Sequence, residues 1–212
     1  MKNLDFLKGN LIAHRGFHNL KEGIPENSLA AFKRAIRNNY VIELDVHLTS
    51  DNKIVVFHDY NLKRACGVNK VIESCTYDEL LKYNLFNTKH KIPLLSSVVN
   101  GKVGLLIETK TINFNGNLER ELSKLLDDYN GSFAIQSFNF FSINWFRKHK
   151  KKYVVGLLSS DFNKRNISNL RKWIGKTLLM DIILRTDFIS YDINALPSSY
   201  VQNKRKSKLV LG

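Results

Sequence analysis

Residues 41–47 read Val-Ile-Glu-Leu-Asp-Val-His, an aliphatic run that is interrupted by two carboxylates. Because successive side chains of a β-strand point to opposite faces, Glu43 and Asp45 share one face of the predicted strand. Two carboxylates within an apolar strand repel each other and resist ionisation unless a cation or a fixed positive side chain lies between them. The run therefore predicts a buried strand with a cation site, and a hard divalent ion bound through oxygen is the natural occupant.

Similar short apolar runs recur along the chain with amphipathic helical stretches between them, the pattern that produces parallel strands joined by helices. The predicted strands cover residues 11–14, 40–46, 53–58, 103–109, 132–137, 153–158, 187–191 and 208–211. One predicted helix begins after Asn27-Ser28, either of which can cap it, and ends at Asn38-Asn39. The other predicted helices cover residues 77–83, 118–129, 140–148 and 167–179. The fold class is therefore α/β, and the number of strands is close to that of a TIM-type (β/α) barrel.

The chain has 212 residues and 43% hydrophobic content, which suits a single domain over residues 1–212. The long mixed segment at residues 61–97 is interpreted as an excursion from the barrel that could cover a site. No stretch approaches the roughly 20 apolar residues that a membrane span needs, and the N-terminal residues lack the apolar core of a signal peptide. We therefore expect a soluble, cytoplasmic protein without a membrane span.

The formal net charge of +14 raises the possibility of nucleic-acid binding, because excess positive charge attracts polyanions. The charge is spread along the chain, and its local clusters at residues 147–152 and 204–208 lack interleaved aromatic residues for base stacking. A solvated basic surface is thus favoured over a specific nucleic-acid site. A positive field would also steer anionic phosphodiesters toward a cleft.

Further ionisable residues follow other predicted strands. Glu108 and Lys110 form another i, i+2 pair, so Glu108 could supply a third oxygen ligand and Lys110 a positive charge for an anionic substrate. His14-Arg15 and His58 follow apolar runs. Each histidine taken alone is better explained as a local strand cap, but the carboxyl ends of barrel strands form the active rim of such folds. Together these residues predict a site with two proton-transfer groups, three carboxylates and two cations.

Three stretches carry a specific resemblance: AHRGFHNLKEGIPENSLAAFKRA (13–35), VIELDVHLTSDNKIVVFHDYNLKR (41–64) and LLIETK (105–110). In order, spacing and residue type they are similar to the signature of the glycerophosphodiester phosphodiesterase family, whose barrel is related to that of phosphatidylinositol phospholipases. The resemblance is strong over about half of the chain. From residue 131 on, the sequence matches the family only in the alternation of short apolar runs and helical stretches.

The resemblance implies a phosphoric diester hydrolase that converts glycerophosphodiesters, small molecules of lipid and glycerol metabolism, to sn-glycerol 3-phosphate and an alcohol. It implies His14 and His58 as the acid/base pair, and Arg15 and Lys110 as phosphate-binding residues. Glu43, Asp45 and Glu108 are implied to hold one divalent cation, Mg²⁺ or Ca²⁺. Whether the nucleophile is water or a hydroxyl of the substrate stays open at this point.

The resemblance also implies a departure at the C-terminus, because the family continues beyond residue 212 with a helix and a strand that close the barrel. A barrel that lacks them would expose unpaired backbone at its edge, which favours self-association. The chain would then be truncated, naturally shortened, or covered by a partner at that edge. Two alternatives to hydrolysis of soluble diesters stay open, namely an impaired barrel that only binds phosphate ligands and phospholipase-type cleavage of an intact lipid.

Overall fold

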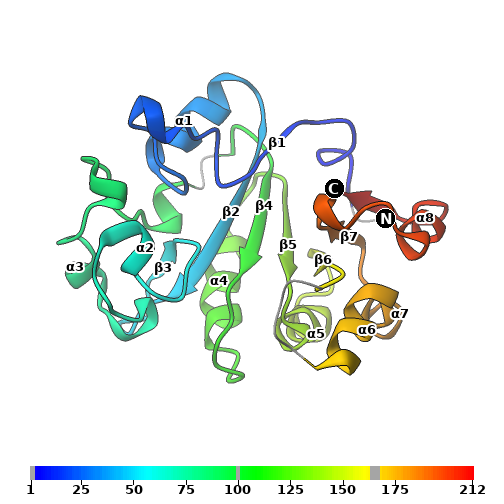
Figure 1. Cartoon of the computed structure of the whole chain (residues 1–212). Coiled ribbons are helices and arrows are strands. Elements are labelled where there is room, and N and C mark those ends of the chain that lie inside the picture. Colours follow the sequence, from blue (N-terminus) through cyan, green and yellow to red (C-terminus); the bar gives the residue numbers. More distant parts are fainter. Residues whose placement is uncertain (1–2, 99–100, 163–167) are drawn as a thin grey trace. The chain divides into compact units, whose positions relative to one another are not determined.

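The computed structural model describes residues 3–98, 101–162 and 168–212. These residues form two compact units, Asn3–Phe133 and Ala134–Gly212. Both units combine strands with helices, which confirms the predicted α/β class (Figure 1). Within the described ranges, none of the helices has the length and apolar character that a membrane span requires.

The first unit contains a parallel sheet in the order β1-β2-β4, in which β2 and β4 run side by side (Figure 1). These strands are β1 (Ile12–Ala13), β2 (Val41–Leu48) and β4 (Leu105–Thr109). The helices of the unit are η1 (Leu20–Glu22), α1 (Leu29–Arg37), α2 (Lys63–Cys66), η2 (Ile72–Ser74), α3 (Tyr77–Leu80), η3 (Leu85–Asn87), η4 (Leu95–Ser97) and α4 (Asn117–Asp127). The predicted strands of this unit are all present, with ends that differ by up to two residues.

One strand runs in the direction opposite to that expected. β3 (Ile54–Val56) pairs antiparallel with β2, with Val46 opposite Val56 and Leu48 opposite Ile54. The predicted alternation of parallel strands and helices is therefore wrong at this point. A parallel pair needs a crossover of a dozen or more residues, whereas only residues 49–53 separate β2 from β3, and these form a tight turn. β2 and β3 thus form a hairpin.

Helix α1 carries the apolar stripe that covers β2. Its N-cap is Ser28, whose Oγ accepts a hydrogen bond from the N–H of Ala31 at 3.2 Å. Phe32 of α1 is 2% exposed, and the aliphatic side chains of β2, Ile42, Leu44 and Val46, are completely buried. These side chains alternate along β2 with the acidic ones, so the strand presents an aliphatic face and a carboxylate face.

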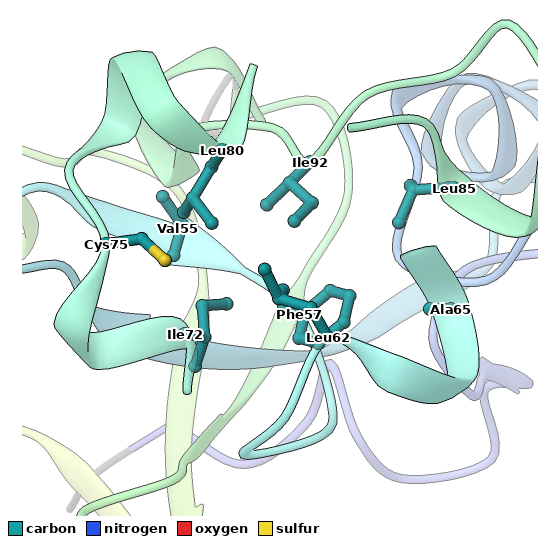
Figure 2. Close-up of a cluster of buried hydrophobic side chains, with 9 residues drawn as sticks. All are labelled: Val55, Phe57, Leu62, Ala65, Ile72, Cys75, Leu80, Leu85 and Ile92. Carbon is teal, nitrogen blue, oxygen red and sulfur yellow. The ribbon is translucent and has the colours of Figure 1, made fainter. Parts of the chain in front are cut away.

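The excursion (residues 61–97) has a small hydrophobic core of its own (Figure 2). Its buried side chains come from β3, from the residue that follows β3, and from the short helices and loops after it, namely Val55, Phe57, Leu62, Ala65, Ile72, Cys75, Leu80, Leu85 and Ile92. Neither Cys66 nor Cys75 forms a disulfide. Because two of these side chains belong to the β2–β3 hairpin segment, the cluster fixes the excursion to the sheet that bears the carboxylates.

The second unit is a parallel sheet in the order β5-β6-β7-β8 with helices between its strands. The strands are β5 (Phe133–Ser137), β6 (Val154–Ser159), β7 (Phe188–Tyr191) and β8 (Leu209–Leu211). The helices are α5 (Phe140–His149), α6 (Asn169–Thr177), α7 (Leu179–Leu184), η5 (Ile193–Ala195) and α8 (Ser199–Arg205). Residue 167, the start of one predicted helix, lies outside the described residues.

A buried carboxylate holds the end of the second unit together. Asp181 of α7 is 1% exposed and accepts hydrogen bonds from Lys204 at 2.8 Å, Lys208 at 2.5 Å and Thr186 at 2.5 Å. Lys204 lies in α8, and Lys208 directly precedes β8. Two cations of the basic cluster at residues 204–208 thus satisfy an internal acid, whereas the sequence favoured a solvated surface for the whole cluster.

We expect the substitution Ile72→Ala to lower the free energy of unfolding by about 2–5 kcal/mol, because it removes a fully buried side chain from the cluster of the excursion. The matched control is Val71→Ala, since the neighbouring Val71 is 46% exposed. Urea denaturation curves of both variants give the measurement. Equal losses in the two variants would show that the cluster does not stabilise the excursion.

Candidate active site

The three predicted carboxylates meet on one face of the sheet in the first unit. Asp45 of β2 and Glu108 of β4 are direct partners in the parallel register, and Glu43 lies two residues earlier on the same face of β2. All three side chains are buried, with residue exposures of 4% for Glu43, 1% for Asp45 and 8% for Glu108. The i, i+2 spacing in β2 and the strand register together bring these residues into one cluster.

Burial and mutual repulsion shift the pKa values of these carboxyl groups. Burial is the largest cause that raises the pKa of Glu43 well above its ordinary value, and the charges of Asp45 and Glu108 add to it. The pKa of Glu108 is raised to about 7, again mainly by burial. Burial alone would also raise the pKa of Asp45, but the ammonium of Lys110 and the imidazole of His58 hold it below its ordinary value.

Lys110 provides the counter-charge within the cluster. Its Nζ lies 2.9 Å from Oδ1 of Asp45 and also contacts Oε1 of Glu108. Burial alone would lower the pKa of Lys110, but the two carboxylates raise it above its ordinary value. One ammonium cannot neutralise three ionised carboxylates, which agrees with the raised pKa values of Glu43 and Glu108.

The carboxylate oxygens are arranged so that one cation could touch all three residues. One oxygen each from Glu43, Asp45 and Glu108 can be chosen so that they all lie within 4.8 Å of one another. Mg²⁺ lies about 2.1 Å and Ca²⁺ about 2.3–2.6 Å from its oxygen ligands, so opposite ligands of one ion are about 4–5 Å apart. An all-oxygen donor set with this spacing fits a hard divalent cation.

The turn that follows β1 places His14 and Arg15 beside this cluster. Arg15 has a left-handed φ of 56°, and in this conformation its backbone N–H donates to Oε2 of Glu43 at 2.9 Å. Gly16 follows with a φ of 80°, and a Cβ at that position would lie 2.8 Å from the Cβ of Ala31 in α1. The His-Arg-Gly sequence thus suits a tight turn that passes close to α1 and directs a backbone donor at a buried acid.

The β2–β3 hairpin brings His58 back to the carboxylates. The N–H of Phe57 donates to the carbonyl of Asp45 at 3.0 Å, so the chain after β3 runs beside the acidic segment of β2. Nδ1 of His58 lies 2.6 Å from Oδ1 of the next residue, Asp59. The sequence predicted His58 near the carboxylates, but by a different route, because a hairpin and not a parallel strand delivers it.

The two histidines share a positive environment. Burial is the largest cause that lowers the pKa of His14 below 6.5, followed by the charge of Arg15. Burial also lowers the pKa of His58, followed by the charge of Lys110, while Asp45 and Asp59 act in the opposite direction. Ionised His58 also contributes to the shift of His14, so the two imidazoles lie within electrostatic reach of each other. Both imidazoles are therefore mostly neutral at pH 7.

Glu26 and Asn27, which the sequence did not assign to the site, also belong to it. Nη1 of Arg15 lies 3.0 Å from Oε1 of Glu26, and Nε of Arg15 lies 3.6 Å from Oδ2 of Asp45. The side-chain amide of Asn27, which is 2% exposed, donates to the same oxygen of Asp45 at 2.9 Å. Asn27 was predicted only as a helix cap, yet its left-handed φ of 52° marks an unusual backbone position of the kind often found at functional sites.

A second arginine, Arg64, also reaches this region from the excursion. The guanidinium of Arg64 donates to Oδ2 of Asp59 at 2.6 Å and to Oε1 of Glu26 at 2.6 Å. Arg64 ends the second stretch of the family resemblance, but no local pattern indicates its partners, one of which lies 38 positions away in the chain.

The two other histidines near the site, His18 and His47, differ in exposure. His18 is exposed, as expected from its loop position. As the last residue of the acidic run, His47 is expected from the sequence at a solvent-facing strand end, but this is wrong, because His47 is completely buried. Its Nδ1 lies 3.4 Å from Oε1 of Glu73, and its ring packs edge-on against Tyr60 at 5.5 Å. This cover comes from η2 of the excursion and from Tyr60 just before it, and the strand pattern alone did not indicate it.

Comparison with known proteins shows the family of this chain. The model of the glycerophosphoryl diester phosphodiesterase family matches residues 14–211, nearly the whole chain. The chain belongs to this family. The match extends well past residue 131, beyond which the sequence motifs gave only a loose resemblance.

Curated relatives carry the same family description. The glycerophosphodiester phosphodiesterase of Caldanaerobacter subterraneus is 33% identical over 167 residues, which cover 72% of this chain and 67% of the relative. YhdW of Bacillus subtilis is 37% identical over 150 residues, which cover 65% of this chain and 60% of the relative. The chain thus spans less than two thirds of the length of YhdW.

Solved structures show the same fold. A glycerophosphodiester phosphodiesterase from Parabacteroides distasonis is 26% identical and has a TM-score of 0.74, with 95% of this chain and 82% of that chain covered. A phosphodiesterase from Oleispira antarctica, solved in complex with the product sn-glycerol-3-phosphate, is 21% identical with a TM-score of 0.77 and the same coverage. These TIM-barrel neighbours agree with the predicted fold class. The predicted lack of a closing strand and helix stays a prediction.

We expect divalent cations to bind more weakly as the pH falls from 8 to 6. Glu108, whose pKa is about 7, holds a proton over part of this range that a cation must displace. The raised pKa of Glu43 acts in the same direction. Isothermal titration calorimetry with Mg²⁺ and Ca²⁺ at both pH values, in buffers of different ionisation enthalpy, measures the affinity and the released protons.

Glu43→Gln should abolish this cation binding, whereas Asp128→Asn, at an exposed acid next to α4, should leave it unchanged. Cation affinity that is independent of pH, or that survives Glu43→Gln, would contradict the expected role of the cluster.

Proposed function

We propose that this chain hydrolyses glycerophosphodiesters to sn-glycerol 3-phosphate and an alcohol with the help of one bound divalent cation. The observation that carries the proposal is the buried cluster of Glu43, Asp45 and Glu108, whose oxygens lie within 4.8 Å of one another. Membership of the glycerophosphoryl diester phosphodiesterase family supports the reaction class. The Caldanaerobacter relative, which is named for this activity, supports the substrate class.

The proposed cation ligands are Glu43, Asp45 and Glu108. A bound Mg²⁺ or Ca²⁺ would supply positive charge where the oxygens of a phosphodiester become more negative in the transition state. The backbone N–H of Arg15 holds one oxygen of Glu43, and Asn27 holds one oxygen of Asp45. These bonds orient the carboxylates before any ligand arrives, which lowers the cost of reorganisation.

His14 and His58 are the proposed acid/base pair. One imidazole removes the proton of the nucleophile, a water molecule or a hydroxyl of the substrate, and the other protonates the oxygen of the departing alcohol. If the substrate hydroxyl attacks, water must then open the cyclic phosphate to give sn-glycerol 3-phosphate. The bond between Nδ1 of His58 and Asp59 leaves Nε2 as the nitrogen that can exchange a proton with the substrate. Because burial and nearby cations lower the pKa of both histidines, a neutral imidazole is available as a base at pH 7.

Arg15 and Lys110 are the proposed phosphate-binding residues. The side chain of Arg15 is 18% exposed and that of Lys110 is 10% exposed, and both lie against the carboxylates. Lys110 now pairs with Asp45 and Glu108, so a cation bound to these acids would compete with its ammonium. Released from that pairing, Lys110 could turn its charge toward an anionic substrate.

We expect His14→Ala and His58→Ala each to lower kcat by about 10²–10⁴-fold, because each removes one step of proton transfer. The measurement is the release of sn-glycerol 3-phosphate from glycerophosphocholine and glycerophosphoethanolamine in the presence of Mg²⁺ or Ca²⁺. His149→Ala is the matched control, since His149 is an exposed histidine of α5.

Excess chelator and Glu43→Ala should each remove the activity, and added cation should restore it only in the wild-type chain. Turnover that persists with chelator, or that is equal in the histidine variants, would refute the assignment. Ligand binding without turnover in the wild-type chain would instead support a binding role.

A further inference from the structure

Arg64 lies where the excursion meets the candidate site. It belongs to α2, and its neighbours Leu62 and Ala65 are buried in the hydrophobic cluster of the excursion. Its guanidinium carbon is 5.2 Å from the centroid of the Phe86 ring, a cation–π distance. The excursion therefore fixes both the backbone and the side chain of this arginine.

The guanidinium of Arg64 bridges two carboxylates with its planar fork. Nε donates to Oδ2 of Asp59 at 2.6 Å, and Nη2 donates to Oδ1 of Asp59 at 3.1 Å and to Oε1 of Glu26 at 2.6 Å. A bidentate contact of this kind sets the orientation of a carboxylate as well as its position. A lysine could not reproduce it, because an ammonium is a single point charge.

Each of the two carboxylates holds a residue of the proposed catalytic set. Oδ1 of Asp59 lies 2.6 Å from Nδ1 of His58. Oε1 of Glu26 lies 3.0 Å from Nη1 of Arg15. A continuous chain of charged contacts thus runs from His58 through Asp59, Arg64 and Glu26 to Arg15.

The guanidinium of Arg64 keeps both carboxylates of this row of contacts ionised. Burial alone would raise the pKa of Asp59 and of Glu26, but hydrogen bonds from Arg64 bring both below their ordinary values. Both carboxylates are therefore ionised at neutral pH. An ionised Asp59 accepts the Nδ1 proton of His58, and this bond fixes the tautomer that leaves Nε2 open.

We propose that Arg64 is a positioning residue, which holds His58 and Arg15 in their reactive orientations through Asp59 and Glu26. This inference rests on the proposed function, since it assigns Arg64 to the support of the same acid/base and phosphate-binding groups. It also gives the excursion a role in the reaction, because a residue of its own core segment orients the imidazole.

If Arg64 only stabilised the fold, its loss would lower the stability of the protein. The side chain of Arg64 is 46% exposed, and ion pairs with that much solvent contribute little to stability. Loss of Arg64 should therefore leave the fold intact while it loosens His58 and Arg15. Thermal melting of Arg64→Ala checks the first part, and the experiments below check the second.

The kinetic experiment compares Arg64→Ala, Arg64→Lys and Lys63→Ala on glycerophosphocholine with saturating divalent cation. Lys63 is an exposed cation of the same helix, so its removal is the matched control. We expect a 10–100-fold loss of kcat/KM in Arg64→Ala. Losses of this size are found when a residue that hydrogen-bonds to a ligating or catalytic side chain is removed. Lys63→Ala should stay within about twofold of the wild-type chain.

Two kinds of rescue separate geometry from charge. Arg64→Lys retains the charge but not the fork, so it should recover little of the lost kcat/KM. Guanidinium ions at millimolar concentration should restore part of the activity of Arg64→Ala and none of that of His58→Ala. Full activity of Arg64→Lys, or wild-type kcat/KM in Arg64→Ala, would overturn the proposal.

A spectroscopic experiment is independent of turnover. In ¹⁵N-histidine-labelled protein without added metal, the Nδ1 proton of His58 should give a downfield resonance in the wild-type chain and in Lys63→Ala. The resonance, assigned by its loss in His58→Gln, should broaden or vanish in Arg64→Ala. If it does so while the wild-type chain releases no glycerol phosphate, the proposed function fails and the positioning role stands. An unchanged resonance in Arg64→Ala would overturn the positioning role.

Discussion

Three acidic side chains within one buried patch are the constraint on which the first unit depends. Glu43, Asp45 and Glu108 would repel each other if all were ionised, and burial raises the cost further. The surrounding chain supplies what this patch needs, with the ammonium of Lys110 against two of the acids and a backbone N–H of Arg15 on the third. Even the left-handed turn after β1 serves this purpose, although such a conformation costs about 1–2 kcal/mol for a residue other than glycine.

Much of this arrangement could be predicted from the sequence because it follows from strand periodicity. The i, i+2 pairs at residues 43–45 and 108–110 depend only on side-chain alternation, and the apolar runs around them located the strands to within two residues. The hairpin was missed because a strand pattern does not record direction. The short turn at residues 49–53 contained the missing information, since its length rules out a crossover connection.

Other parts of the site could not be read from local patterns at all. Glu26 and Arg64 lie in different stretches of the family resemblance, 38 positions apart, and no local pattern shows that their side chains meet. His47 was expected at the surface because strand periodicity does not show what covers a strand end, and the excursion buries it. Contacts of this kind depend on how a locally folded segment docks on the sheet, which only the three-dimensional structure specifies.

The hairpin that carries His58 also makes the chain unevenly tolerant of insertions. Extra residues in the turn at 49–53 could be absorbed by a longer loop, because the pairing of β2 with β3 would stay in register. One residue added between Ile54 and His58 would instead rotate the imidazole to the opposite face of the strand. Two added residues would restore the face but shift the ring by about 7 Å along β2. Length in this family member can therefore change at the tip of the hairpin, but not along the arm that ends in His58.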